Sequence, residues 1–172
     1  SRRARARFFI DRAAAQRTQS SIALTADNKR WFLCNASPDL RQQLLQTPAL
    51  HPKNEPRHSP IQGVVLTNAD VDHIAGLLNL RESQPLRLYG TRKVLDVLEA
   101  NTVFNVLNPK FVVRESFVLD EPVELNLANG EPSGIVVVPF AVPGKVALWL
   151  EDERKGVSLA AVGEDTIALE VR

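Results

Sequence analysis

The sequence at residues 61–81 is IQGVVLTNADVDHIAGLLNLR, and its pattern changes twice along its length. The apolar residues of 61–67 predict a buried strand, and the polar residues of 68–72 predict a loop. From residue 73 to residue 81, apolar side chains recur at helical spacing, at Ile74, Leu77, Leu78 and Leu80. This strand–loop–helix unit indicates a layered α/β fold, because such a fold buries strands beneath amphipathic helices.

The rest of the chain mixes predicted strands and helices in the same way. Strands are predicted at residues 18–25, 30–35, 86–89, 111–118, 123–127, 135–140, 146–151, 157–162 and 166–172, and helices at residues 2–16, 38–45 and 93–100. Ser37 or Asp39 is expected to cap the second helix, and Thr91 the third. Asp27-Asn28 and Asn129-Gly130 are typical of tight turns. The strands at 111–118 and 123–127 are expected to be neighbours in a meander.

The composition is that of an ordinary globular domain. The chain has 172 residues, of which 44% are hydrophobic and 24% are charged, enough to bury a single core. No apolar run is long enough to span a membrane.

Residues 1–17 hold six arginines and leave a net charge of −4 on the remainder. We interpret this basic start as a solvated helix and expect no nucleic-acid partner, because no basic patch extends it. With Cys34 as the single cysteine, no intramolecular disulfide can form, and a cytoplasmic location is expected.

Three side chains in the loop of residues 68–72 and at the start of the next helix have metal-ligating chemistry. Asp70, Asp72 and His73 follow a buried strand, and ligands of open α/β sheets bind at such strand ends. The alternative is purely structural: Asp72 caps the helix and His73 faces solvent. The local pattern leaves both interpretations open.

The same residues resemble the metallo-β-lactamase superfamily, whose strand end carries His-x-His-x-Asp-His. Asn68 and Asp70 stand in place of the first two histidines, whereas Asp72 and His73 match the last pair. This departure resembles one family of the superfamily, the B proteins of pyrroloquinoline quinone (PQQ) biosynthesis. Further stretches similar to that family are residues 17–23, 35–43, 57–61, 65–82, 142–146 and 148–152.

The resemblance implies an αββα sandwich, of which residues 1–172 form one incomplete domain, roughly its first half. The chain lacks methionine even at position 1, and residues 166–172 alternate like a strand up to the last residue, so we expect a piece of a longer protein. The family's cysteine cluster would then precede Ser1, and a further metal-binding histidine would follow Arg172. The isolated chain is accordingly expected to show little or no activity.

The resemblance also implies a site and a function. Asp72 and His73 would hold one divalent metal, with Fe(II) favoured and zinc as the alternative, and Asn68 and Asp70 would support these ligands. The implied role is PQQ biosynthesis through metal-dependent hydroxylation of a peptide-derived tyrosine precursor. The alternatives are a carrier that assists the passage of PQQ or its precursor towards the periplasm, a metal-dependent hydrolase, and an inert fragment. Exposed strand edges lead us to expect self-association into homo-oligomers.

Several other residues are secondary candidates. Arg41 and Lys145 are considered for contact with a substrate, each against a structural alternative: the start of a helix for Arg41 and a turn between strands for Lys145. His51 and His58 are interpreted as ordinary residues of a proline-rich loop. Cys34 is interpreted as a small buried hydrophobic residue.

Overall fold

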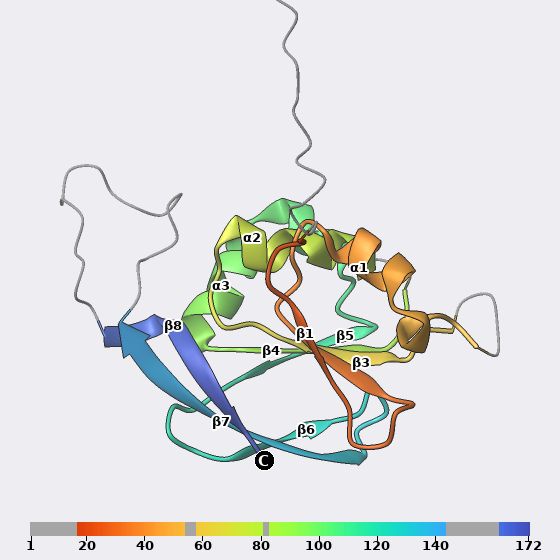
Figure 1. Cartoon of the computed structure of the whole chain (residues 1–172). Coiled ribbons are helices and arrows are strands. Elements are labelled where there is room, and N and C mark those ends of the chain that lie inside the picture. The colour runs from red at the N-terminus through yellow and green to blue at the C-terminus, as the bar shows by residue number, and fades with distance from the viewer. Residues whose placement is uncertain (1–16, 54–57, 81–82, 144–161) are drawn as a thin grey trace, which may run out of the picture.

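The computed structural model describes residues 17–53, 58–80, 83–143 and 162–172 (Figure 1). The predicted helix at 2–16 and the predicted strand at 146–151 lie outside these residues. So do Lys145 and, apart from Val162, the predicted strand at 157–162. Within the described residues, no helix has the length and apolar character needed to cross a membrane.

A five-stranded sheet forms the centre of the molecule, in the order β1-β2-β3-β4-β5. Its strands are β1 (Ile22–Leu24), β2 (Trp31–Cys34), β3 (Ile61–Val65), β4 (Leu86–Gly90) and β5 (Val112–Ser116). β1 is antiparallel to β2, and all the later pairs are parallel. The carboxyl ends of β2, β3, β4 and β5 therefore lie at one edge of the sheet, where α/β proteins bind ligands.

Helices cover one face of this sheet (Figure 1). They are α1 (Leu40–Gln46), α2 (Val71–Ile74) and α3 (Arg92–Ala100), with the 3₁₀ helices η1 (Pro48–Leu50), η2 (Ala75–Leu80) and η3 (Thr102–Val106). The other face carries a three-stranded antiparallel sheet of β6 (Val123–Asn126), β7 (Pro132–Pro143) and β8 (Val162–Val171). The described residues thus form a helix layer and two sheet layers.

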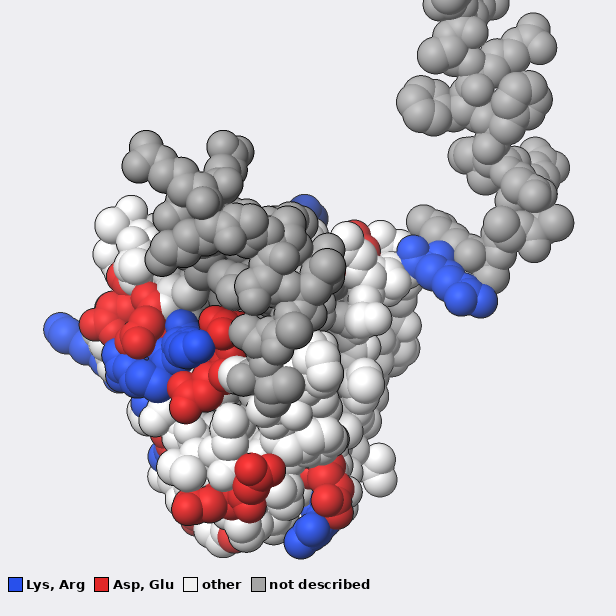
Figure 2. Space-filling view, turned by 90° about the vertical axis from the view of Figure 1, so that its left-hand side faces the viewer, with Lys and Arg blue, Asp and Glu red and all other residues white. Residues whose placement is uncertain are grey.

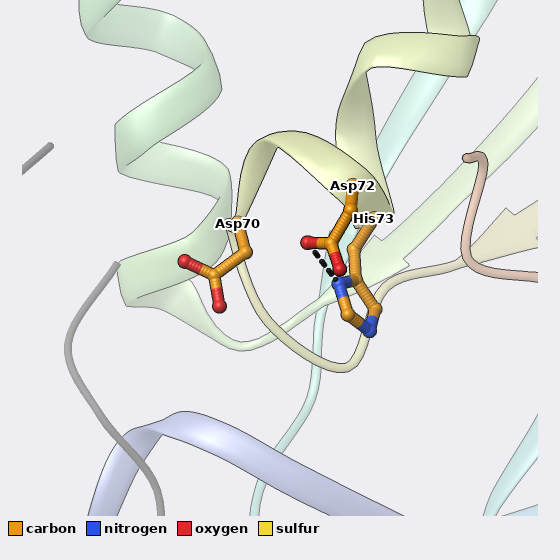
Figure 3. A group of neighbouring side chains, drawn as sticks. All are labelled: Asp70, Asp72 and His73. Atoms are coloured by element: carbon orange, nitrogen blue, oxygen red, sulfur yellow. Dashed lines mark hydrogen bonds and ion pairs between the residues drawn. The ribbon is translucent and has the colours of Figure 1, made fainter. Parts of the chain in front are cut away.

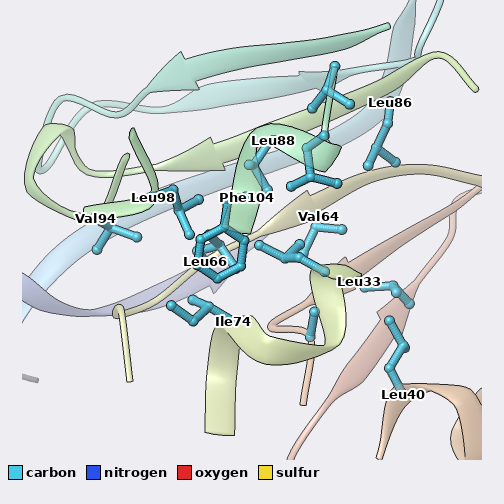
Figure 4. Close-up of a cluster of buried hydrophobic side chains, with 14 of the residues drawn as sticks. Leu33, Leu40, Val64, Leu66, Ile74, Leu86, Leu88, Val94, Leu98 and Phe104 are labelled. Carbon is cyan, nitrogen blue, oxygen red and sulfur yellow. The ribbon is translucent and has the colours of Figure 1, made fainter. Parts of the chain in front are cut away.

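The central strands alternate between two buried clusters. Leu33, Val64 and Leu88 face the helices in the first cluster, part of which is drawn in Figure 4. Phe32 and Tyr89 face the second sheet, where Tyr89 stacks on Phe117 with ring centroids 5.9 Å apart. This alternation follows from the two-residue period of a strand that is covered on both faces.

The predicted meander of residues 111–118 and 123–127 is wrong, because its two strands belong to different sheets. β5 pairs in parallel with β4, whereas β6 begins the second sheet. Between them, Phe117 is buried against the second cluster, and its backbone N–H donates to the Gly90 carbonyl. The chain crosses from the first sheet to the second at Phe117, whose side chain is buried between the two layers.

The predicted helix at residues 73–81 is also corrected. Helix α2 begins earlier, at Val71, and gives way to 3₁₀ geometry at Ala75. The cause is visible in the backbone of Gly76, whose N–H donates to the Ala36 carbonyl at 2.8 Å instead of continuing the α-helical pattern. A contact with a neighbouring loop therefore interrupts the helix.

The predicted caps have different outcomes. Thr91 caps α3 as expected, because its Oγ1 accepts from the Val94 N–H at 3.3 Å. At α1, Asp39 is the N-cap residue by position, but neither its side chain nor that of Ser37 caps the helix. Asp39 Oδ2 instead accepts from the Gln19 N–H, and Ser37 Oγ donates to Gln43.

Candidate metal centre

The candidate metal-ligating residues lie on the segment that leaves the carboxyl end of β3. Residues 66–70 form the loop, and helix α2 begins immediately afterwards. We call residues 66–73 the metal loop. Because Asp72 lies inside the first turn of α2, the alternative in which it caps this helix is wrong.

Asp70, Asp72 and His73 come together at one point. The potential ligand atoms of these three side chains all lie within 4.8 Å of one another. Asp72 Oδ1 lies 2.8 Å from His73 Nδ1, and Figure 3 shows this pair with the Asp70 carboxylate beside it. The Asp72 side chain is 52% exposed and that of His73 is 23% exposed, so the group is open to an incoming ion. His73 Nε2 has no hydrogen bond to any described residue and remains free to bind a ligand.

Asn68 shapes the metal loop through its own backbone. Its Oδ1 accepts from the Asp70 N–H at 2.9 Å, which is the hydrogen bond of an Asx turn. The Asp70 carbonyl then accepts from the N–H groups of His73 and Ile74, at 2.9 and 3.1 Å. A local hydrogen-bond chain therefore orders the segment that carries the three candidate ligands.

Asn35, at the end of β2, is a site residue that residue-by-residue reasoning missed. Its side chain accepts from the Thr67 N–H at 2.9 Å and donates to Thr67 Oγ1 at 3.0 Å. Asn35 has a φ of 64°, in the left-handed region that asparagine enters more readily than most residues. An Asn directly after a buried strand is a usable signal for such a turn, but the partner on β3 is visible only in the fold.

Strand β8 reaches the same edge from the second sheet. The Ile167 N–H donates to the Thr67 carbonyl at 2.9 Å, and Thr91 Oγ1 donates to the Glu164 carbonyl at 2.6 Å. Lys93 Nζ lies 2.9 Å from Asp165 Oδ2. These contacts fix the second sheet beside the metal loop.

Charges of both signs are mixed on the side of the molecule seen in Figure 2. Along α3, Arg92 pairs with both Asp96 and Glu99. Ion pairs of this exposed kind contribute little to stability. Among the described residues in this view, no large patch of a single charge, of the kind that attracts a nucleic acid, is seen.

The structure separates the two candidate histidines of the proline-rich loop from the metal loop. Arg41 is exposed in the first turn of α1, on the helical layer. His51 and His58 line a cavity of about 280 Å³ together with Ile61 and Leu86, the first residues of β3 and β4. That cavity lies at the amino ends of the strands, opposite the end that carries the metal loop.

Cys34 is not part of the metal-ligating group. It is partly buried at the end of β2, and burial raises the pKa of its thiol to about 11. A thiol with this pKa stays protonated at neutral pH and is a poor metal ligand or nucleophile. This fits its interpretation as a small hydrophobic residue.

Comparison with known proteins supports the fold and the superfamily. The family described as "Beta-lactamase superfamily domain" matches residues 30–165. Coenzyme PQQ synthesis protein B of Xanthomonas oryzae pv. oryzae is 50% identical over 92% of this chain and 50% of its own length. The protein of the same name from Methylobacterium nodulans is 56% identical over 83% of this chain and 46% of its own length.

A solved structure is also similar. The crystal structure of Zn²⁺-bound PqqB from Methylobacterium extorquens superposes with a TM-score of 0.82 at 46% identity, over 90% of this chain and 49% of that one. The chain spans about half the length of the curated relatives it matches. The metallo-β-lactamase fold expected from the metal loop is confirmed, as is the resemblance to the B proteins of PQQ synthesis. This chain belongs to the beta-lactamase superfamily.

Proposed function

We propose that this chain serves PQQ biosynthesis as part of a metal-dependent enzyme that hydroxylates a peptide-derived tyrosine precursor. One observation carries the proposal: Asp70, Asp72 and His73 cluster on the metal loop of a chain about half identical to coenzyme PQQ synthesis B proteins. The similar crystal structure is described as Zn²⁺-bound, which supports a divalent metal in proteins of this kind.

The donor atoms of the cluster fit a divalent ion. Asp70 and Asp72 offer carboxylate oxygens, His73 offers an imidazole nitrogen, and these atoms lie within 4.8 Å of one another. Carboxylate and imidazole ligands that leave coordination positions open are typical of non-haem Fe(II), and the same ligands also suit zinc. Iron supplies redox chemistry towards dioxygen, whereas zinc supplies Lewis-acid chemistry.

Each residue of the cluster has a separate task in this proposal. Asp72 and His73 bind the ion, which takes the place of the hydrogen bond between Asp72 Oδ1 and His73 Nδ1. Asp70 supports the site from the N-cap position of α2. Asn68 orients Asp70 through the hydrogen bond to its backbone. The precursor, or PQQ itself, is the small molecule that approaches from the exposed side of Asp72.

The first test measures metal binding by the chain of residues 1–172. Equilibrium dialysis against Zn²⁺, and anaerobically against Fe²⁺, is expected to give about one ion per chain. Asp72→Asn and His73→Gln are each expected to weaken binding by at least roughly 100-fold, because each removes a ligand. His51→Gln is the matched control, since His51 lies at the opposite end of the sheet. If both loop variants bind the ion with wild-type affinity, the metal loop is not the metal site and the proposal fails.

The second test concerns the reaction. Residues 1–172 would replace the matching segment of the full-length Methylobacterium nodulans relative, and the chimera would receive Fe²⁺, dioxygen, a reductant and a tyrosine-containing peptide. Mass spectrometry is expected to show gain of one oxygen atom, abolished by Asp72→Asn and retained by His51→Gln. A chimera that binds PQQ tightly in both variants without oxygen transfer would favour the carrier role instead.

A further inference from the structure

We propose that Asn35 is a positioning residue that fixes the geometry of the metal loop from the neighbouring strand. The turn of Asn35 and Ala36, which follows β2, holds the metal loop at both of its ends. This inference rests on the proposed function insofar as the loop binds metal, but the contacts that carry it belong to the chain alone.

The first end of the loop is held by the Asn35 side chain. Asn35 Oδ1 accepts from the Thr67 N–H at 2.9 Å and lies 3.2 Å from Thr67 Oγ1, to which Asn35 Nδ2 donates at 3.0 Å. Asn35 is only 9% exposed, so these hydrogen bonds are shielded from water. A buried side-chain amide without hydrogen-bond partners lowers the stability of the fold. The position and orientation of the Asn35 side chain are therefore tightly constrained.

The second end is held by the next residue. The Ala36 N–H donates to the His73 carbonyl at 2.7 Å, and the Ala36 carbonyl accepts from the Gly76 N–H at 2.8 Å. Both Ala36 and Gly76 are buried. The backbone of a candidate ligand, His73, is therefore tied directly to the turn that follows β2.

The backbone conformation of Asn35 links the two ends. Its N–H still pairs with the Val65 carbonyl at 2.8 Å, as in the parallel ladder, and its φ of 64° then turns the chain so that Ala36 meets His73. Glycine would reach the same φ but would lack the side chain that binds Thr67. Asparagine supplies the conformation and the side chain together, so the residue connects β2, β3 and α2.

The loop between these two anchors contains Asn68, Asp70 and Asp72. Metal affinity depends on how well the ligands are held before the ion arrives, and partners of the ligand-bearing backbone contribute to it strongly. Releasing one anchor lets the carboxylates of Asp70 and Asp72 move relative to His73. The expected consequence is weaker binding and a changed coordination geometry, beyond any general loss of stability.

The experiment compares variants that separate conformation from side-chain contact. Asn35→Gly keeps the left-handed φ and removes the side chain, Thr67→Val removes the hydroxyl, and Thr67→Ser retains it. Ser21→Ala is the matched structural control, because Ser21 Oγ donates to the Asn35 carbonyl at 3.0 Å without touching the metal loop. Dissociation constants are measured with Co²⁺ and Zn²⁺ on residues 1–172, together with the visible absorption spectrum of bound Co²⁺.

Asn35→Gly and Thr67→Val are expected to weaken metal binding by roughly 10–100-fold and to shift the Co²⁺ spectrum. Thr67→Ser is expected to bind within a few-fold of the wild type, and Ser21→Ala to leave both readouts unchanged. If Asn35→Gly binds Co²⁺ with wild-type affinity and spectrum, the inference is overturned.

A readout without metal keeps this inference distinct from the proposed function. In the metal-free chain, amide hydrogen exchange at His73 and Ile74 reports the bonds that these N–H groups donate to Asp70. Asn35→Gly is expected to accelerate this exchange at least roughly tenfold over Ser21→Ala, which corresponds to more than about 1.4 kcal/mol of local stability. If the wild type binds no metal, the proposed function fails, but hydrogen exchange in the metal-free chain still tests the role of Asn35. Equal exchange rates in Asn35→Gly and Ser21→Ala would overturn that role.

Discussion

At the scale of single residues, the edge that carries the metal loop depends on how closely backbones can approach. Gly76 donates its N–H to the Ala36 carbonyl, and this contact turns α2 into the 3₁₀ helix η2. A Cβ at position 76 would lie far inside contact distance of the Ser37 carbonyl oxygen and 2.8 Å from the Ala36 carbonyl. These are backbone atoms, which cannot rotate away as a flexible side chain can. Position 76 therefore requires glycine because there is no room for a Cβ atom, and not because of a positive φ.

Gly76→Ala is expected to lower the free energy of unfolding by about 1–3 kcal/mol, because the added methyl group forces η2 away from the Ala36–Ser37 backbone. Gly90→Ala is the matched control. A Cβ at position 90 would lie 3.4–3.6 Å from the Val94 and Leu95 side chains, which is ordinary contact. Urea unfolding followed by circular dichroism measures both variants. Equal stability of the two would show that the approach of Gly76 to the Ala36–Ser37 backbone does not constrain the fold.

How much of the site could be predicted differs from residue to residue. Asp72 and His73 were indicated by their types and by their position after a buried strand, and the structure brings them together with Asp70. Asn35 lies 32 residues from Thr67 in sequence, so no local pattern could reveal their contact. The candidate ligands are visible in the sequence by residue type, whereas the contact of Asn35 with Thr67 depends on strand pairing.

At the scale of elements, the β1–β2 turn is organised by one carboxylate. Asp27 Oδ1 accepts from the N–H groups of Lys29 and Arg30, both at 2.8 Å, and Asp27 Oδ2 accepts from Arg30 Nε at 2.6 Å. Hydrogen bonds from the Arg30 and Lys29 backbone, together with the Arg30 guanidinium, hold the pKa of Asp27 well below its usual range. Asn28 follows with a φ of 58°, which confirms the turn expected at Asp27-Asn28.

The depressed pKa of Asp27 predicts a pH dependence with a definite sign. The unfolded chain takes up a proton on this carboxylate near pH 3.9 while the folded chain does not, so the stabilisation is present above that pH and lost as the pH falls below it. Asp27→Asn is therefore expected to be less stable than the wild type at pH 7, and the gap should narrow between pH 4 and pH 2. Urea midpoints at several pH values measure it, and a gap that widens on acidification would contradict the assignment.

Thr91 joins α3 to β8 through one hydroxyl. Its Oγ1 accepts from the Val94 N–H and donates to the Glu164 carbonyl, and the residue is fully buried. Thr91→Val keeps the shape but leaves both backbone groups without this partner, so a loss of about 1–3 kcal/mol of unfolding free energy is expected. Thr91→Ser keeps the hydroxyl and should lose less than half as much. Thermal unfolding of the two variants decides this, and a larger loss in Thr91→Ser than in Thr91→Val would assign the effect to packing of the methyl group.

The sequence predicted most described elements, but not which sheet each one joins. The predicted strands at 111–118 and 123–127 are both rich in apolar residues, yet β5 pairs with β4 and β6 pairs with β7. Their buried side chains also belong to different cores: β5 buries Val112 beneath the helices, whereas β6 buries Leu125 between the sheets. Pairing partners are set by the three-dimensional order of the sheet, which the local pattern does not encode.

At the scale of the whole molecule, the five-stranded sheet belongs to two cores at once. Neighbouring residues of β4 point in opposite directions: Leu88 packs beneath the helices, and Tyr89 packs against the second sheet. Tyr89 also links the layers by hydrogen bonds, because its hydroxyl accepts from the Asn126 N–H at 2.8 Å. Arg87 adds a further link, since its Nε donates to the Leu127 carbonyl at 2.7 Å. Disruption of either core is therefore transmitted through the same strand.

This shared sheet predicts that the two layers unfold together. Leu88→Ala damages the core beneath the helices, and Leu125→Ala damages the core between the sheets; both side chains are fully buried. Each is expected to lower the free energy of unfolding by about 2–5 kcal/mol. Because β4 contributes to both cores, circular dichroism and tryptophan fluorescence should follow one coincident urea transition in each variant. If the small sheet were an independent unit, Leu125→Ala would produce an early separate transition while the helical signal kept its wild-type midpoint. That result would mean that the metal loop, which is tied to β8 through the Thr67 carbonyl, is stable without the second sheet beside it.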